Sequence, residues 1–258
     1  NREMLFPTHV LLLATLPRPP SQLHQTIGAL GFTRPTHVQE AAYDHLAQGH
    51  DAVLLAEAGA GKTLAYLLPL LARAGQEPTT TLVAVPTHDL ALQLVRVAST
   101  LGAKAKRVGA AARDEELVVG TAVEVAPLVR AAVGVQPSKR AGSPPPRPRR
   151  RIQLVLDEAD FLLAGLRRKG RGVTDAPAMQ LLDAVRHERS SAGSSRVQLV
   201  LVSATIPGQS KSSVGALIDS KFPRIRWIRT EGAHRPMASL SSRFVEVTDD
   251  ACRREVLL

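Results

Sequence analysis

Cysteine, aromatic residues and long apolar runs are all scarce in this sequence of 258 residues. Cys252 is the only cysteine, which excludes an internal disulfide framework and a zinc site built from several cysteines. Phe, Tyr and Trp together make up 3% of the chain. Apolar runs such as 10–13 and 53–56 are far shorter than the roughly 18 residues that a membrane-spanning helix needs. We therefore expect a soluble protein of a reducing compartment, with no membrane partner.

Positive charge is concentrated in two short segments. The net charge is +10, from 33 Lys and Arg against 23 Asp and Glu, and the sequence pI is about 10.6. Ten of the cations lie in 137–151 and 164–173, which contain no acids, so 33 minus 10 leaves 23 cations against 23 acids in the rest of the chain. Both segments are rich in Pro, Gly or Arg and are predicted to be exposed insertions. Such charge favours a polyanionic partner; the alternative is a pair of solvated loops without a function.

Short apolar runs alternate with segments of helical pattern along the chain. This alternation predicts an α/β fold with a central parallel sheet flanked by helices. Two helices are expected at 64–74 and 90–100. Strands are expected at 52–56, 81–85, 117–119, 152–156 and 198–202, with two later ones at 225–228 and 244–247.

A phosphate-binding loop is predicted directly after the first of these strands. The sequence from Ala56 to Thr63 is a small-residue turn that ends in Gly-Lys-Thr and leads into an apolar helix. Backbone N–H groups and a helix N-terminus can surround phosphates in such a turn. Lys62 would reach the β and γ phosphates, and Thr63 would hold Mg²⁺. The first position is Ala rather than Gly, and a chance glycine-rich turn is the alternative. The candidate residues for nucleotide binding are Ala58, Gly59, Ala60, Gly61, Lys62 and Thr63.

A second half of a phosphate site follows the strand at 152–156. Asp157, Glu158 and Asp160 come directly after this strand, and open α/β sheets bind ligands at the carboxyl ends of their strands. Asp157 would hold Mg²⁺, partly through water, and Glu158 would orient and polarise the water that attacks the γ-phosphate. Taken alone, Asp157 could instead cap a helix.

These motifs, in this order, resemble the first RecA-like lobe of the DEAD-box RNA helicases. The resemblance rests on 56–63, on Asp-Glu-Ala-Asp at 157–160, on Ser-Ala-Thr at 203–205 and on the Q-motif-like 31–39. It implies a RecA-like P-loop NTPase lobe over 1–241, and it makes 242–258 a linker and the start of a second lobe absent from this chain. The cofactors that it implies are ATP and Mg²⁺.

The resemblance also assigns roles to single residues. Gln39 would read the adenine edge, with Phe32 and Arg34 beside it, and Thr36 would brace the P-loop. For Phe32, packing beneath the motif is the simpler interpretation. Ser203 and Thr205 would connect the γ-phosphate sensor with the DEAD sequence through hydrogen bonding with Asp160. The residues assigned to catalysis are Lys62, Asp157, Glu158, Ser203 and Thr205.

Several family positions carry other residues, mostly in the RNA-binding half. An aromatic residue that stacks on adenine is replaced by Ala14, and Ala58 stands where the P-loop usually has Thr. The family's Pro-Thr-Arg-Glu-Leu-Ala reads Pro-Thr-His-Asp-Leu-Ala at 86–91, and Thr-Pro-Gly-Arg reads Thr-Ala-Val-Glu at 121–124. Because an anion replaces a cation there, we expect a weaker grip on the RNA backbone.

RNA contacts are expected to have moved in part to the basic segments. The segment 137–151 precedes its strand and should emerge opposite the nucleotide as a docking arm, whereas 164–173 starts on the catalytic side. Protein partners are also expected through these insertions. The RNA-binding candidates are Pro86, Thr87, Thr121, Arg147, Arg149, Arg150, Arg167 and Arg168.

The sequence therefore favours a diverged ATP-dependent RNA helicase that remodels RNA or RNP. Ribosome assembly is the expected setting, with ribosomal RNA as the partner and mitochondria as the favoured compartment. Hydrolysis would require arginine fingers from the second lobe. One alternative is a catalytically weak or inactive pseudo-helicase that serves as a structural assembly factor. Another is a P-loop NTPase that acts on protein.

Overall fold

The computed structural model describes residues 34–74, 78–109, 117–134, 150–164, 176–192, 196–206 and 213–230. The helices in these ranges are α3 (His37–Ala47), α4 (Lys62–Ala74), α5 (His88–Thr100), α6 (Ala122–Val133), α7 (Ala159–Ala164), α8 (Pro177–Ala192) and α9 (Val214–Lys221). The strands are β1 (Ala52–Leu55), β2 (Thr79–Val85), β3 (Ala105–Arg107), β4 (Leu117–Thr121), β5 (Arg151–Asp157), β6 (Val197–Ser203) and β7 (Arg226–Arg229).

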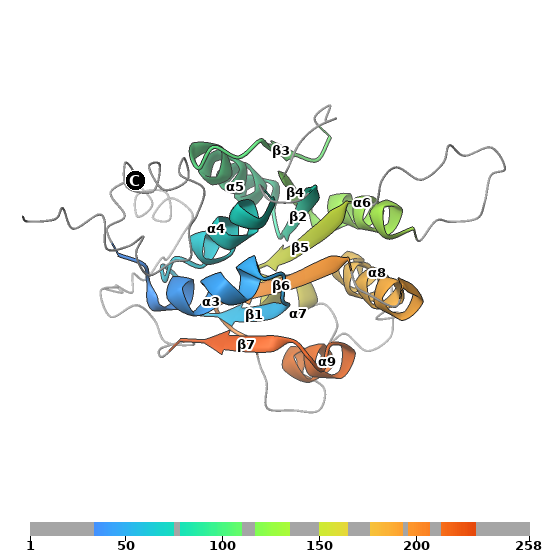
Figure 1. Cartoon of the computed structure of the whole chain (residues 1–258). Coiled ribbons are helices and arrows are strands. Elements are labelled where there is room, and N and C mark those ends of the chain that lie inside the picture. The colour runs from blue at the N-terminus through green and yellow to red at the C-terminus, as the bar shows by residue number, and fades with distance from the viewer. Residues whose placement is uncertain are drawn as a thin grey trace, which may run out of the picture.

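The seven strands form one parallel sheet in the order β3-β4-β2-β5-β6-β1-β7. Helices α3, α4 and α5 contribute to a hydrophobic core on one face, and α6, α7, α8 and α9 contribute to a second core on the other. Figure 1 shows the twisted sheet between these two groups of helices. The predicted α/β fold with a parallel sheet between helices is thus confirmed.

The strands are apolar because each one serves both cores. Successive side chains of a strand point to opposite faces, so Ala52 and Leu54 of β1 join the first core while Val53 and Leu55 join the second. All four residues of β1 and all seven of β6 are buried. Parallel strands covered on both faces require this near-continuous apolar character.

The predicted strands from 52 to 228 are confirmed, with small differences in extent. β2 begins at Thr79, two residues earlier than expected, and α4 and α5 also begin two residues before their predicted starts. β3 was not expected, since Ala-Lys-Arg is short and carries no apolar run. The strand predicted at 244–247 lies outside the described residues, as do most of the insertions 137–151 and 164–173.

Among the helices of the described ranges, none has both the length and the hydropathy that crossing a bilayer requires.

Leu154 tests the contribution of the second core to stability. It lies on β5, near the middle of the sheet, and its side chain is fully buried. Replacing Leu154 with Ala should lower the free energy of unfolding by about 2–5 kcal/mol, because methyl and methylene groups leave the core and a cavity remains. Leu92→Ala, at a site that is 43% exposed, should change it by less than about 0.5 kcal/mol. Urea denaturation would measure both, and equal losses would contradict the assignment of this core.

Candidate active site

The carboxyl ends of β1, β6 and β5 lie side by side at one edge of the sheet. Parallel pairing places Leu55 of β1 opposite Ser203 of β6, and Asp157 of β5 opposite Val202 of β6. The chain segments that leave these three strands therefore meet, although they are far apart in the sequence. They are the predicted P-loop, the Asp-Glu-Ala-Asp sequence and Ser-Ala-Thr at 203–205.

The P-loop has the backbone geometry that surrounds an anion. Gly59 and Gly61 have φ of 78° and 83°, which residues with a Cβ rarely adopt. Lys62 is the first residue of α4, and its Nζ donates to the carbonyl oxygens of Ala56 at 2.9 Å and Glu57 at 3.0 Å. The ammonium charge is thus held beside a helix N-terminus, where unpaired N–H groups attract phosphate.

Gln39 connects the start of α3 to the P-loop. Its Oε1 accepts from Thr36 N at 3.0 Å, and its Nε2 donates to Gly61 O at 3.2 Å. A Cβ on Gly61 would overlap the Gln39 amide nitrogen and lie 3.4 Å from Thr36 Oγ1. Gly61 is therefore required both by its positive φ and by this close approach. The adenine-reading role of Gln39 stays a prediction; Arg34 is exposed nearby in the sequence, and Phe32 lies outside the described residues.

Asp157 is half-buried, and both oxygens of its carboxyl group accept hydrogen bonds. Tyr66 OH donates to Oδ2 at 2.8 Å, and Glu158 N donates to Oδ1 at 3.0 Å. Burial raises the pKa of Asp157, and the Tyr66 hydroxyl, the Glu158 N–H and the Lys62 charge oppose that rise. Burial, together with the neighbouring Asp157, also raises the pKa of Tyr66 well above its usual value. Tyr66 is a site residue that the sequence interpretation missed, since no motif joins it to position 157.

Glu158, the residue after Asp157, has a strained backbone. Its φ is +53°, the only positive value at a non-glycine position in the described chain, and such strain costs of the order of 1–3 kcal/mol and clusters at active sites. Burial raises its pKa, and so do Asp157 and Asp160, while Lys62 lowers it. A carboxylate of raised pKa is a better proton acceptor near neutral pH.

Thr205 connects the Ser-Ala-Thr segment with the end of the DEAD sequence. Its hydroxyl donates to Asp160 Oδ2, as expected. The expectation that Ser203 also bonds Asp160 needs correction: Ser203 Oγ donates to Thr205 O at 3.1 Å and accepts from Thr205 N at 3.1 Å. Ser203 is fully buried, so its hydroxyl shapes the turn that presents Thr205 and reaches Asp160 only through Thr205.

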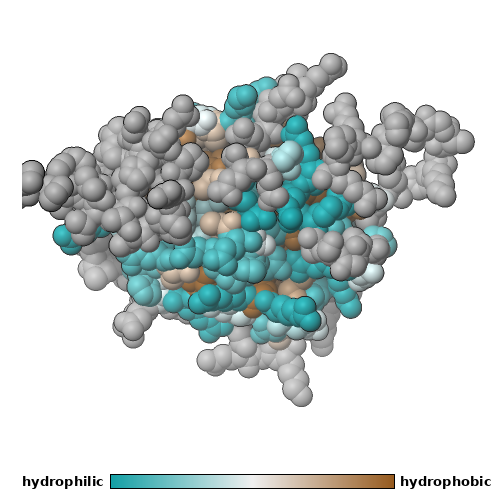
Figure 2. All heavy atoms as spheres, viewed as in Figure 1, coloured by the Kyte–Doolittle hydropathy of each residue, from teal (hydrophilic) through white to brown (hydrophobic). Residues whose placement is uncertain are grey.

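A cavity of about 610 Å³ lies between the P-loop, the two carboxyl groups that follow β5, and Ala204. This size is typical of small-molecule sites. P-loop residues, Thr63, Asp157 and Glu158 line its polar end, and Leu90, Leu94 and Val97 of α5 line an apolar end. Figure 2 shows hydrophobic residues at the surface over α4 and α5, beside a more hydrophilic surface over α3. The polar end has the hydrogen-bond donors and carboxylates that a nucleoside triphosphate with Mg²⁺ would require.

The predicted RNA-binding residues before α5 and α6 lie at the caps of these two helices. Thr87 caps α5, with Leu90 N donating to its Oγ1 at 3.2 Å, and Pro86 lines the cavity. Thr121 caps α6. Arg150 is exposed next to the start of β5. The other arginine candidates, Arg147, Arg149, Arg167 and Arg168, lie outside the described residues.

Glu124 holds the N-terminus of α6 in place of the family's cation. Thr121 N and Thr121 Oγ1 donate to its Oε2 at 2.8 and 3.0 Å. These bonds lower the pKa of Glu124, with a further contribution from His88, whose Nδ1 lies 3.7 Å from the same oxygen. His88 and Glu124, two of the residues that depart from the family pattern at these motifs, are therefore neighbours, and the Thr121 hydroxyl donates to the Glu124 carboxylate.

The fold and this edge define a P-loop NTPase lobe, with a phosphate loop on β1 and acidic residues at the end of β5. The sequence profile of the DEAD/DEAH box helicases matches residues 36–213. The chain belongs to this family.

Several curated relatives share substantial identity with the chain. DEAD-box ATP-dependent RNA helicase 58, chloroplastic, of Oryza sativa is 32% identical over 84% of this chain and 46% of its own length. DEAD-box ATP-dependent RNA helicase 47, mitochondrial, of Arabidopsis thaliana is 31% identical over 73% of this chain and 37% of its own length. ATP-dependent rRNA helicase RRP3 of Lodderomyces elongisporus is 40% identical over 31% of this chain and 16% of its own length. The chain thus spans less than half the length of these relatives.

Solved structures share the fold. A DEAD box protein from Methanococcus jannaschii superposes with a TM-score of 0.60 at 20% identity, over 83% of this chain and 54% of that one. Dbp5 of S. cerevisiae, bound to RNA and ADP BeF3, superposes with a TM-score of 0.57 at 21% identity, over 82% of this chain and 50% of that one. Each likeness concerns the RecA-like fold of the lobe.

The Tyr66 hydrogen bond can be tested with a matched pair of variants. Tyr66→Phe removes the hydroxyl that donates to Asp157 Oδ2 and should lower the free energy of unfolding by about 1–3 kcal/mol at pH 7. The loss should shrink at acid pH, because the bond favours the ionised carboxylate. Tyr43→Phe is the control, since Tyr43 is equally buried but its hydroxyl has no partner among the described residues. Equal losses in urea denaturation, or a loss independent of pH, would contradict the role of the bond.

Glu124 should stabilise α6 in a pH-dependent manner. Because its folded pKa is lowered, its contribution is present above its unfolded pKa and is lost as pH falls through the folded value. Glu124→Ala should therefore cost about 0.5–2 kcal/mol at pH 7 and less at pH 3 to 4. Asp44→Ala, at an exposed position of α3, serves as the control in urea titrations at both pH values. If Glu124→Ala instead lowered the free energy of unfolding more at pH 3 to 4 than at pH 7, the capping interpretation would be wrong.

Proposed function

We propose that this chain is the ATP-binding lobe of an RNA-stimulated ATPase that remodels RNA or RNP. One observation carries the proposal: the P-loop, the carboxyl groups of Asp157 and Glu158, and the Asp160–Thr205 hydrogen bond share one edge of the sheet. This arrangement combines a phosphate site, a candidate base and a link to the rest of the protein. Membership of the DEAD/DEAH box family supports it.

Each residue at this edge has a chemical task in the proposed reaction. The P-loop N–H groups and Lys62 bind the phosphates, and Thr63 with Asp157 would hold Mg²⁺, which neutralises phosphate charge when bound. Glu158 orients the attacking water and accepts its proton. Tyr66 keeps Asp157 oriented by hydrogen bonding to the oxygen that the Glu158 N–H does not contact.

Coupling to RNA is proposed to run through the second lobe. Asp160 bonds Thr205, so a displacement at the γ-phosphate is transmitted to the segment that follows β6. A closing second lobe would supply arginine fingers and complete the RNA grip. The chain spans less than half the length of its curated relatives, and for this reason turnover is assigned to the whole protein.

Ribosome assembly in mitochondria is the proposed setting, with ribosomal RNA as the partner. Two observations support it: one relative is named as an rRNA helicase and two as organellar proteins, and the chain carries a net charge of +10. A basic protein of this kind is suited to the phosphates of a large RNP.

A structural assembly factor without turnover is the second candidate. It is favoured by Glu124, which places a carboxylate on the Thr121 hydroxyl, where the resemblance implies an RNA contact. A chain that grips RNA weakly through these motifs would gain little from an ATP-driven cycle. The intact Lys62, Asp157 and Glu158 favour the enzyme.

Glu158→Gln distinguishes the two candidates. In single-turnover assays with the whole protein and single-stranded RNA, we expect the hydrolysis rate to fall about 100-fold or more, while ATP binding is retained because Gln keeps the size of the side chain. Asp44→Asn, on the exposed side of α3, should hydrolyse at the unmodified rate.

If the folded, unmodified protein did not hydrolyse ATP, the proposal of an enzyme would be wrong and the structural assembly factor would be favoured. Turnover that depends on protein but is indifferent to RNA would identify an NTPase acting on protein instead.

A further inference from the structure

The end of α3 and the short segment that joins it to β1 receive hydrogen bonds from other elements. Gln198 of β6 donates from Nε2 to Leu46 O at 2.8 Å and to His50 O at 2.9 Å. Arg73 of α4 donates from Nη1 to Ala47 O at 3.0 Å. These bonds lie where the strands begin, at the edge of the sheet opposite the nucleotide site, and none of the motifs of that site includes them.

The carbonyl groups at the end of a helix have no partner within the helix, so those of 44–47 in α3 need other donors. Backbone N–H groups of 48–50 reach the first three, and the side chains of Gln198 and Arg73 reach the last two. Because each partner of the Gln198 amide is a carbonyl oxygen, only its nitrogen can face them. Gln198 is 5% exposed, and its removal would take two hydrogen bonds from the base of α3.

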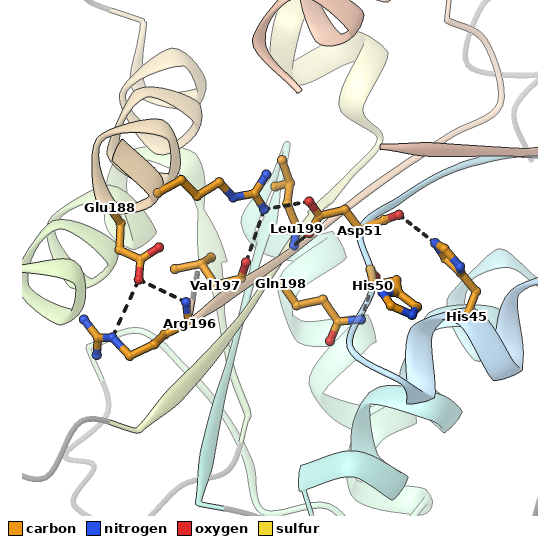
Figure 3. A network of polar contacts seen from close by, with 9 residues as sticks. His45, His50, Asp51, Glu188, Arg196, Val197, Gln198 and Leu199 are labelled. Atoms are coloured by element: carbon orange, nitrogen blue, oxygen red, sulfur yellow. Dashed lines mark hydrogen bonds and ion pairs between the residues drawn. The ribbon is translucent and has the colours of Figure 1, made fainter. Parts of the chain in front are cut away.

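Asp51, the residue before β1, strengthens the same connection. Its Oδ1 accepts from Leu199 N of β6 at 2.8 Å, and its carbonyl oxygen lies 2.9 Å from His45 Nε2, in the last turn of α3. Figure 3 shows this network, with the Gln198 amide directed at His50. The base of α3 is thus joined to the beginning of β6 through both Gln198 and Asp51.

The other end of α3 contacts the P-loop through Gln39. The Gln39 Nε2 donates to Gly61 O at 3.2 Å, which is the long end of the usual N–H···O range of about 2.7–3.2 Å. A movement of a few tenths of an ångström away from the P-loop would therefore weaken the bond. Movement in the other direction is limited as well, since the amide nitrogen lies only 2.4 Å from the position that a Cβ on Gly61 would occupy.

α3 connects these two ends as a short rod. Its 11 residues span about 16 Å at 1.5 Å per residue. Val38, Ala42, Tyr43 and Leu46 are its buried residues, and the spacing of four between three of them makes a narrow apolar stripe. Apolar contacts are not directional, so they tolerate small movements along the helix axis. The hydrogen bonds at the two ends resist such movements, and a displacement of the base would reach Gln39.

β6 links this anchor with the nucleotide edge. Gln198 is the second residue of β6 and Ser203 is the last, and all seven residues of the strand are buried. Ser203 shapes the turn that presents Thr205. One buried strand therefore sets the position of both α3 and the Ser-Ala-Thr segment.

We propose that Gln198 is a positioning residue of the nucleotide site: it fixes the base of α3 to β6, holds the Gln39 amide at the P-loop and thereby raises the affinity for ATP. Gln198 is not among the described residues that line the nucleotide cavity, so it acts through α3 and Gln39. This role rests on the proposed function, in which the cleft binds ATP. A side chain that only stabilised the fold would change ATP affinity no differently when Gln39 is absent.

Gln198→Met removes both hydrogen bonds with a side chain of similar length. With the whole protein and a fluorescent ATP analogue in the presence of Mg²⁺, the affinity should fall about 3- to 10-fold, as for other residues coupled to a site that they do not touch. In a Gln39→Ala background the same substitution should have no further effect, because the residue through which Gln198 acts is gone. An unchanged affinity, or an equal loss in both backgrounds, would overturn the proposal.

Amide hydrogen exchange supplies a readout that needs no nucleotide. In the nucleotide-free protein, Gln198→Met should accelerate exchange at the start of α3, where Glu40 N donates to Thr36 O, as well as at the end of the helix. If the acceleration were confined to the end of α3, the role of Gln198 would be local and the proposal would be wrong.

Ser213→Ala is the matched control for lost stability. The Ser213 hydroxyl caps α9 by accepting from Ala216 N at 3.1 Å, so the variant loses a helix cap while α3 keeps its contacts. Its ATP affinity and its exchange at the start of α3 should equal those of the unmodified protein. All variants are compared at a temperature at which circular dichroism and urea unfolding show them to be folded.

Arg73→Met provides the same test if Gln198→Met does not fold. Arg73 is half-buried, and the variant removes the side-chain donor to Ala47 O at the same end of α3. We expect a smaller loss of ATP affinity that again disappears in the Gln39→Ala background. Full affinity in Arg73→Met would then overturn the proposal.

ATP binding by the unmodified protein separates this role from the proposed function. If the unmodified protein binds ATP and Gln198→Met binds it equally well, the positioning role is wrong and the ATP-binding lobe stands. If the unmodified protein does not bind ATP, the proposed function is wrong, while the exchange data still decide whether Gln198 holds the start of α3 in place.

Discussion

Parallel pairing of β1, β6 and β5 is the constraint on which the molecule depends. It aligns Leu55 with Ser203 and Asp157 with Val202, so every carboxyl end of the three strands faces one edge. The same pairing collects the three strand starts at the other edge. One edge therefore holds the carboxyl groups of Asp157 and Glu158, and the other holds a cluster of arginines. The topology thus places the acids after β5 and this group of arginines at opposite edges of the sheet.

The nucleotide site is maintained at the expense of stability. Asp157 has a raised folded pKa, so between its unfolded and folded pKa values the native state binds more protons than the unfolded one. Stability contributed by this group consequently falls as pH rises through that window. The Tyr66 hydroxyl reduces the cost by bonding to the ionised form, and Glu158 adds backbone strain at the next position. Sites that need charged groups in buried positions commonly show this trade-off.

Local patterns predicted most of this architecture, whereas contacts between distant residues were predicted only where the family resemblance implied them, as for Thr205 and Asp160. The apolar runs located the strands because each must be buried on two faces, and the motifs located Lys62 and Asp157. β3 was missed since a strand of three residues with a single apolar side chain, Ala105, has no period to detect. The Tyr66–Asp157 bond spans 91 positions, and no sequence spacing encodes it. Glu124 is a different case: Thr-x-x-Glu at 121–124 is a capping box, so its bonds to Thr121 could have been expected from the sequence.

The caps of α5 and α6 show how departures from the family pattern act locally. Thr87 accepts from Leu90 N at the start of α5, and the Thr121 hydroxyl donates to Glu124 at the start of α6. Because His88 Nδ1 lies 3.7 Å from the same Glu124 oxygen, substituted positions of the two motifs contact each other at the helix ends. Asp157 to Asp160 keep the family sequence, so the divergence lies at the starts of α5 and α6 rather than at the carboxyl groups that end β5.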